Sequence, residues 1–231
     1  MNAHTIDPLV EQAIRMQAGG GVLEGTLAMP QTAAGVVVFA HGSGSGRHSP
    51  RNRFVARVLG EAGLATLLLD LLTADEDAVD AHAAEFRFDI ALLAERVVGA
   101  TDWLAGADAT AALSVGYFGA STGAGAALVA AARRPERVRA VVSRGGRPDL
   151  AADDLPRVKA PTLLIVGGAD GPVIGVNRQA LDRLGSKEKG LHIIPGTTHL
   201  FEEPGALDEV ARLAADWFTR HMLSTLHGTQ P

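Results

Sequence analysis

Continuous runs of apolar residues alternate along the chain with stretches of helical periodicity. The runs at 36–40 and 64–69 are apolar throughout, which is typical of strands buried on both faces of a parallel sheet. Further strands are expected at 138–142, 161–166 and 191–194, and another leads into Gly119. Two earlier segments, 10–16 and 22–29, have the pattern of antiparallel strands joined through 19–21. The pattern therefore predicts a mostly parallel sheet that starts with an antiparallel pair.

Helical segments separate these strands from residue 36 onward. Apolar residues from Ile90 to Leu104 recur every three to four positions, which predicts a helix over 86–104. Ser49 is a suitable N-cap for a helix that begins at Pro50 and ends at Gly63. Further helices are expected directly after Ser121, at 177–184, and from Leu207 to Phe218. This alternation predicts an α/β fold with helices on both faces of the sheet.

Composition places the chain among ordinary globular proteins. Apolar residues make up 47% and charged residues 20% of 231 positions, which is enough for one large domain over 1–231. The net charge of −5 argues against a nucleic-acid partner. The absence of cysteine excludes disulfides and a cysteine nucleophile.

The beginning of the chain lacks the features of an export signal. Residues 1–15 include Asp7 and Glu11 and have no basic flank followed by an apolar core. No run approaches the roughly 20 apolar residues of a membrane span. We therefore expect no membrane partner and a cytoplasmic location.

The most informative motif is Gly119-Ala120-Ser121-Thr122-Gly123, between an expected strand and an Ala-rich helix. A G-x-S-x-G sequence in that context has the form of a nucleophile elbow, a tight turn that exposes a serine hydroxyl above the sheet. Gly119 and Gly123 supply space where a Cβ would obstruct the close packing of strand and helix. Because the chain contains 27 glycines, the motif alone can arise by chance, and its context must decide.

Candidate reactive residues follow three of the expected strands. In parallel sheets, such groups lie beyond the carboxyl ends of the strands, where Ser121, Asp170 and His199 are placed. A serine hydroxyl needs a base to take its proton, and the base needs a carboxylate to orient it. We therefore expect Ser121 as nucleophile, His199 as base and Asp170 as orienting acid. Alternatively, each of the three is an ordinary turn or loop residue without a catalytic role. If that holds for Asp170, Asp149 or Asp153 would be the orienting acid.

A glycine-rich segment, 41–46, follows the first buried strand. A developing oxyanion needs backbone N–H donors, and Thr122 is one candidate because it follows the nucleophile. The second is expected from this loop, at Ser43 or next at Gly44, with His41 bracing the loop by hydrogen bonds. The loop lacks the lysine and the glycine spacing of nucleotide-binding motifs, and the chain has no H-E-x-x-H metal motif. We therefore expect no cofactor and no metal.

Basic residues crowd the segment after that loop. They are Arg47, His48, Arg51 and Arg53. The simplest interpretation is that these side chains are solvated. The alternative is that Arg47 or Arg51 contacts an anionic group of the substrate, because a guanidinium matches a carboxylate in shape and charge. Arg144 and Arg147, which follow the strand at 138–142, would join them in that case.

These motifs resemble the α/β-hydrolase superfamily and, within it, the dienelactone-hydrolase-like family. The resemblance runs from about Val22 to Met222, and its carriers are the segments 41–46, 119–123, 167–170 and 196–201. It implies an α/β-hydrolase fold with a Ser121–Asp170–His199 triad and no cofactor. Dienelactone hydrolases place a cysteine at the elbow, so the serine here implies an esterase rather than a dienelactone-specific enzyme. Only 146–159 is available for a cap, which implies small or open-site acyl substrates.

The expected function is therefore a serine hydrolase that cleaves small carboxylic esters through an acyl-enzyme. Thioester, lactone or amide hydrolysis and acyl transfer would use the same three residues. A catalytically silent binding protein on the same fold is the alternative from a different class. Reaction of Ser121 with a fluorophosphonate probe would separate an active enzyme from a silent protein.

Overall fold

The computed structural model describes residues 9–222, and eight strands within them form one sheet. The strands are β1 (Val10–Ala18), β2 (Gly21–Met29), β3 (Gly35–Ala40), β4 (Ala65–Leu69), β5 (Ser114–Ala120), β6 (Val138–Arg144), β7 (Thr162–Gly167) and β8 (Lys189–Ile194). Their order in the sheet is β1-β2-β4-β3-β5-β6-β7-β8. β2 pairs antiparallel with β1 and β4, and all other neighbours are parallel. The α/β fold expected from the alternation of apolar runs is confirmed.

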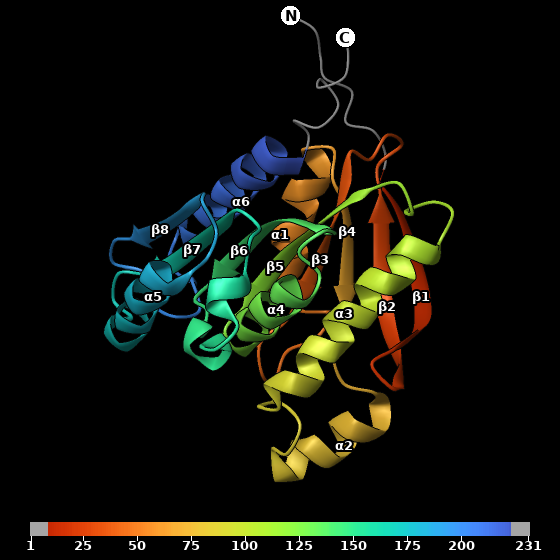
Figure 1. Cartoon of the computed structure of the whole chain (residues 1–231), viewed down its shortest axis with the longest axis horizontal. Coiled ribbons are helices and arrows are strands. Elements are labelled where there is room, and N and C mark those ends of the chain that lie inside the picture. The colour runs from red at the N-terminus through yellow and green to blue at the C-terminus, as the bar shows by residue number, and fades with distance from the viewer. Residues whose placement is uncertain (1–8, 223–231) are drawn as a thin grey trace, which may run out of the picture.

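Helices cover both faces of the sheet (Figure 1). One face carries α3 (Ile90–Gly106), α4 (Thr122–Arg133) and α5 (Gly171–Arg183), and the other carries α1 (Pro50–Glu61) and α6 (Ala206–Met222). A further helix, α2 (Ala74–Ala83), lies beyond the end of β4 and apart from both layers (Figure 1). Two short 3-10 turns, Pro148–Ala151 and Leu155–Arg157, follow β6.

The sheet separates two apolar cores. On one side Leu59 of α1 and Phe218 of α6 pack together, and on the other Leu93 of α3 packs in the core that contains α4. All positions of β3 and β4 are buried, which explains their continuous apolar runs. Each fully buried Leu or Phe contributes about 1.5–3 kcal/mol relative to an exposed one. This burial stabilises the central strands, and the stable strands fix the positions at which the loops at their carboxyl ends begin.

The hydrophobic pattern does not predict α2, because its one buried residue is Asp80. The signal that marks its start is polar. Thr73 Oγ1 accepts the N–H of Glu76 at 3.2 Å, and the Glu76 carboxylate accepts the N–H of Thr73 at 2.8 Å. This reciprocal pair is a capping box, which satisfies two backbone donors at the start of a helix.

Two other helices begin at different residues from those expected. α3 starts at Ile90 rather than 86, because the backbone N–H groups of Phe86 and Arg87 bind the Asp80 carboxylate at 2.7 and 2.9 Å. α5 starts at Gly171 rather than 177, with a proline at the start of its first turn.

Residues 1–8 lie outside the described residues, so the expectation of no export signal concerns a segment that is only partly described. Over 9–222, no helix is long and apolar enough to cross a membrane. The same residues contain no group of three His, Asp or Glu side chains that could hold a metal ion.

Candidate active site

Ser121 lies at the turn between β5 and α4, with a backbone φ of 50° and ψ of −122°. A residue with a side chain in such a sparsely populated region costs about 1–3 kcal/mol, so the surrounding structure must impose it. A Cβ on Gly123 would lie 2.2 Å from the carbonyl oxygen of Ala40, and one on Gly119 would lie 2.4 Å from the Cα of Ala124. Only glycine fits at both positions, and the close packing they permit lifts Ser121 out of the sheet.

The side chains of Ser121, His199 and Asp170 form a continuous series of contacts. Ser121 Oγ lies 3.3 Å from His199 Nε2, and His199 Nδ1 lies 2.7 Å from Asp170 Oδ2. With the Nδ1–H directed at the carboxylate, Nε2 is left as the acceptor that faces the serine hydroxyl. The structure thus brings together the three residues that follow β5, β7 and β8.

Hydrogen bonds between the loop after β7 and the loop after β8 hold Asp170 and His199 in place. In the loop after β7, Gly168 N–H donates to Ile194 O at 2.7 Å, and Ala169 N–H donates to Thr197 O at 2.9 Å. A Cβ on Gly167 would lie 2.3 Å from Thr197 O, so the two backbones can approach this closely only because glycine stands there. The Asp170 side chain is 14% exposed and that of His199 39%, so the acid is shielded while the imidazole reaches solvent.

The alternative acids are engaged elsewhere or exposed. Asp149 Oδ2 lies 2.6 Å from Arg147 Nη2, and this hydrogen bond from the guanidinium lowers the pKa of Asp149. Asp153 is exposed. Of the three carboxylates considered, Asp170 is the one that contacts His199.

His41 joins the loop after β3 to the loop after β4. Its Nε2 accepts the N–H of Leu71 at 3.0 Å, and its Nδ1 lies 2.9 Å from Gly42 O. Burial lowers the pKa of His41, in keeping with a neutral ring that accepts at Nε2. The imidazole therefore braces the glycine-rich loop, as the sequence predicts.

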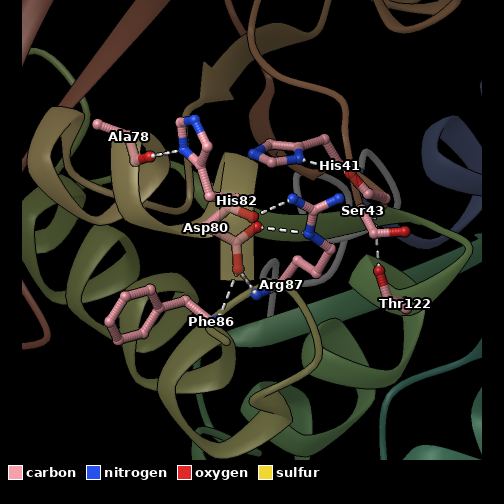
Figure 2. Close-up of polar contacts among 9 residues, drawn as sticks. His41, Ser43, Ala78, Asp80, His82, Phe86, Arg87 and Thr122 are labelled. Atoms are coloured by element: carbon pink, nitrogen blue, oxygen red, sulfur yellow. Dashed lines mark hydrogen bonds and ion pairs between the residues drawn. The ribbon is translucent and has the colours of Figure 1, made fainter. Parts of the chain in front are cut away.

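The backbone donor expected at Ser43 has a protein partner. Its N–H donates to Thr122 Oγ1 at 3.0 Å (Figure 2), and Thr122 is only 5% exposed. Ser121, the N-cap of α4, makes no side-chain cap bond, and the N–H of Thr122 has no backbone partner among the described residues, so it is an open donor at the helix start. Gly44, the other candidate, lies at a positive φ of 67° with no atom within 4 Å of where its Cβ would be. No motif or spacing in the sequence indicates that Thr122 contributes its side chain.

Two of the candidate substrate-binding arginines already have acidic partners. Arg47 contacts the Asp70 carboxylate through Nη1, and its Nη2 lies 2.7 Å from Glu24 Oε2. Arg51 Nη1 lies 3.0 Å from Glu202 Oε1. These carboxylates occupy the guanidinium groups that were candidates to bind a substrate anion. Because they lie far from the arginines in sequence, local sequence spacing cannot predict the contacts.

Arg144 is different, because it is buried without an ion pair among the described residues. It is 8% exposed, its guanidinium lies 5.5 Å from the ring centroid of Phe201, and its Nε has no hydrogen-bond partner. Burial, with a smaller contribution from the charge of Arg51, lowers the pKa of Arg144 to about 10. A positive charge therefore lies beside the loop that carries His199.

A cavity of about 680 Å³ lies between the glycine-rich loop and α2. Gly42 and Ser43 line one side, and Asp80 and Arg87 line the other. Asp80 Oδ2 accepts from Arg87 Nε at 2.5 Å, which holds the guanidinium toward the cavity between α2 and the loop (Figure 2). Cavities of this size accommodate small-molecule ligands. Thus α2, which the hydrophobic pattern does not predict, forms a wall of this cavity next to the candidate site.

That wall is fastened to the sheet by Arg96 of α3. Its Nη2 lies 2.5 Å from Glu76 Oε1 in α2, and its Nη1 donates to Ala18 O of β1 at 2.8 Å. Arg96 is 2% exposed, and a Cβ on Gly21 would lie 2.3 Å from its Nη1. One buried guanidinium on α3 therefore joins α2 to β1, the edge strand of the sheet.

Comparisons with known proteins agree with the fold described above. A model of the dienelactone hydrolase family matches residues 23–228. The crystal structure of a dienelactone hydrolase from Anabaena variabilis ATCC 29413 is 61% identical with a TM-score of 0.91, and the match covers 93% of this chain and 99% of that one. Est1E from Butyrivibrio proteoclasticus shares the fold at 16% identity and a TM-score of 0.75, over 90% of this chain and 98% of that one.

One curated relative has a name that describes a transferase rather than a hydrolase. A Mycobacterium tuberculosis (strain ATCC 25618 / H37Rv) protein whose name describes a phosphoribosyl transferase is 57% identical over 215 residues. The match covers 93% of this chain but 47% of that protein, so the chain spans about half the length of the curated relatives it matches.

Proposed function

The chain belongs to the dienelactone hydrolase family, and from that membership we propose that it is a serine hydrolase that cleaves carboxylic esters. Family membership supports hydrolase chemistry, and the geometry of one site supports the finer assignment. The observation that carries the proposal is the series of contacts from Ser121 Oγ to His199 at 3.3 Å and from His199 to Asp170 at 2.7 Å.

The proposed reaction has two halves. Ser121 Oγ attacks the ester carbonyl carbon while His199 Nε2 takes its proton, which gives a tetrahedral intermediate. The intermediate collapses when the bond to the alcohol oxygen breaks, and His199 returns the proton to the leaving alcohol. Water then attacks the acyl-enzyme with His199 again as the base, which releases the acid and restores the Ser121 hydroxyl.

Two features favour these steps electrostatically. The Asp170 carboxylate stabilises the imidazolium that forms on His199, and it fixes the tautomer that accepts at Nε2. The carbonyl oxygen becomes negative next to the start of α4, where the Thr122 N–H is uncapped and the helix dipole is positive.

The same residues support a proposal for the substrate class. A serine rather than a cysteine stands at position 121, which supports ordinary esters. A lactone is a cyclic ester that the same steps open, and 61% identity to the Anabaena variabilis dienelactone hydrolase favours lactones as the second candidate. The phosphoribosyl transferase name belongs to proteins of which this chain spans about half, and we do not extend that activity to this chain.

The charge of the substrate depends on which arginines are available. Arg47 and Arg51 have carboxylate partners, so we do not assign them to a substrate anion. Arg144 has none among the described residues, and it is the arginine for which a role with an anionic acyl group stays a proposal.

The test is a panel of p-nitrophenyl esters that varies acyl length and charge, together with a lactone and a thioester. The wild-type protein is expected to hydrolyse short esters, and the Ser121→Ala variant is expected to lose activity to background with an unchanged melting temperature. A fluorophosphonate probe should label Ser121, as shown by mass spectrometry of peptides. Hydrolysis that survives Ser121→Ala, or a wild-type protein that neither hydrolyses nor labels, would refute the proposal.

A further inference from the structure

The first residue of α4 brings a hydroxyl, as well as its amide, to the region beside Ser121. Thr122 Oγ1 accepts the Ser43 N–H at 3.0 Å, and the residue is 5% exposed (Figure 2). A hydroxyl has two acceptor sites and one donor proton. Within 9–222, Thr122 Oγ1 makes no hydrogen bond in which it donates, so its proton is uncommitted.

The position of this hydroxyl matters because a nucleophile elbow determines where the oxyanion of the reaction binds. The motif places the oxyanion between the N–H of the residue after the nucleophile and an N–H from the loop after β3. Those two groups are the amides of Thr122 and Ser43, and the second of them donates to Thr122 Oγ1 at 3.0 Å. The Ser43 N–H is therefore directed at the hydroxyl oxygen, and the hydroxyl proton is the donor that this contact leaves available.

The side chain is also held before any substrate arrives. A β-branched residue has few χ1 rotamers in a helix, and the hydrogen bond from Ser43 selects among those open to threonine. A donor whose oxygen is already held in place and largely removed from water interacts most strongly with the charge that develops in the transition state. It needs little reorganisation during the reaction.

We propose that the hydroxyl of Thr122 is a donor to the oxyanion, so that this residue contributes both its N–H and its Oγ–H. Ser43 is then a positioning residue, which acts through Thr122. The interaction is a hydrogen bond, and the proton stays on Thr122 throughout. This inference rests on the proposed function, because it assigns a role at the same site.

Two substitutions at this position separate the hydroxyl from the rest of the side chain. Thr122→Val keeps the shape and removes the hydroxyl, whereas Thr122→Ser keeps the hydroxyl. Removing one oxyanion donor lowers kcat by about 10²–10³-fold, and we expect Thr122→Val to do so with little change in KM. Thr122→Ser is expected to restore most of kcat. Thr110→Val is the matched control, because that buried threonine bonds Leu104 O at 2.7 Å and precedes β5 at the opposite end of the sheet.

A structural role for Thr122 gives different results. If the hydroxyl only braced the glycine-rich loop, Thr122→Val would weaken binding of a trifluoromethyl ketone and of an unreactive amide analogue equally. An oxyanion donor affects the ketone alone, because only the ketone forms a tetrahedral adduct with a charged oxygen. We expect the loss of ketone affinity to follow the loss of kcat/KM.

The direct test is the crystal structure of the wild-type protein with a phosphonate adduct on Ser121. The proposal expects the phosphoryl oxygen within about 3.2 Å of Thr122 Oγ1. A phosphoryl oxygen bound by the Ser43 N–H, with Thr122 Oγ1 beyond hydrogen-bond distance, would overturn it. So would a Thr122→Val variant with kcat within about threefold of that of Thr122→Ser, far less than loss of such a donor causes. Neither result affects the proposed function, which fails only in the Ser121 experiments.

Discussion

His199 Nδ1 lies 2.7 Å from Asp170 Oδ2, although the two residues belong to loops that follow different strands. The loops are hydrogen-bonded to each other through backbone groups just before the two residues, from Gly168 to Ile194 and from Ala169 to Thr197. The imidazole is therefore held from one side by a carboxylate that the backbone has fixed in place, and its other nitrogen is free to face Ser121.

This contact predicts the effect of Asp170→Asn. An amide in place of the carboxylate would favour the wrong imidazole tautomer and could not stabilise the imidazolium, so we expect kcat to fall by about 10³–10⁴-fold. Steady-state kinetics on a short p-nitrophenyl ester measure this effect. Asp149→Asn serves as the control and should change kcat by less than about threefold, well short of the loss of an orienting acid. Equal losses in the two variants would contradict the assignment of the acid.

The packing beneath the elbow predicts that Gly123→Ala is strongly destabilising. The new Cβ would lie 2.2 Å from Ala40 O and 2.3 Å from His41 O, and both atoms belong to backbone that cannot move aside easily. We expect a loss of about 3 kcal/mol or more in the free energy of unfolding, at the upper end for overpacking. Gly106→Ala, with no atom within 4 Å of the new Cβ, should be neutral or stabilising by up to about 1 kcal/mol.

Urea denaturation of both glycine variants measures the difference. Similar midpoints for Gly123→Ala and Gly106→Ala would show that the strand and helix can separate without cost, contrary to the packing described here.

The burial of His41 predicts a dependence of stability on pH. Burial lowers its pKa in the folded protein below the ordinary value of 6.5, against smaller opposing effects from Gly42 O, Asp70 and Asp77. The unfolded chain therefore binds the proton first, so stability is complete above pH 6.5 and falls as the pH drops below that value. The slope approaches about 1.4 kcal/mol per pH unit for one proton.

Urea unfolding of wild type and His41→Gln between pH 7.5 and 5 tests this. The variant is expected to be less stable at pH 7.5 but to lose less stability on acidification. His221, whose pKa burial also lowers, is present in both proteins, so its effect cancels in the difference. Parallel pH profiles would mean that His41 does not titrate as described.

Two buried arginines should respond differently to substitution by methionine. Arg144 has no carboxylate partner among the described residues and lies over the Phe201 ring, so Arg144→Met removes a buried charge that no anion neutralises and should change stability by less than about 1 kcal/mol or increase it. Arg96 binds Glu76 and Ala18 O, so Arg96→Met leaves acceptors unpaired and should cost about 2–3 kcal/mol. Melting temperatures and urea midpoints in the same buffer compare the two variants. A larger loss of stability in Arg144→Met than in Arg96→Met would contradict the contacts assigned to these arginines.

Much of the fold and the contact of three candidate residues could be predicted from the sequence. Buried parallel strands are apolar on both faces, so their runs are visible without an alignment. Ser121, Asp170 and His199 each follow such a run, and the geometry of parallel sheets brings the ends of neighbouring strands together. The structure places the three in contact, and their catalytic roles are the proposal.

Other parts of the site could not be predicted, for physical reasons. α2 buries an aspartate rather than an apolar stripe, so no periodicity in hydrophobicity reveals it. The partners of Arg47 and Arg51 are brought close only by the folded sheet. The bond between Ser43 and Thr122 joins residues 79 positions apart, and it depends on a rotamer that composition does not specify.

The contacts of Arg96 bear on how the wall of the cavity can move. If α2 detached alone, Arg96 would lose Glu76 while it stayed beneath the surface, and an unpaired interior charge is costly. We therefore expect opening of the wall to be coupled to release of the hairpin at the edge of the sheet, through the bond to Ala18 O. Amide hydrogens in α2 and at the β1–β2 turn would then exchange with solvent as one cooperative unit.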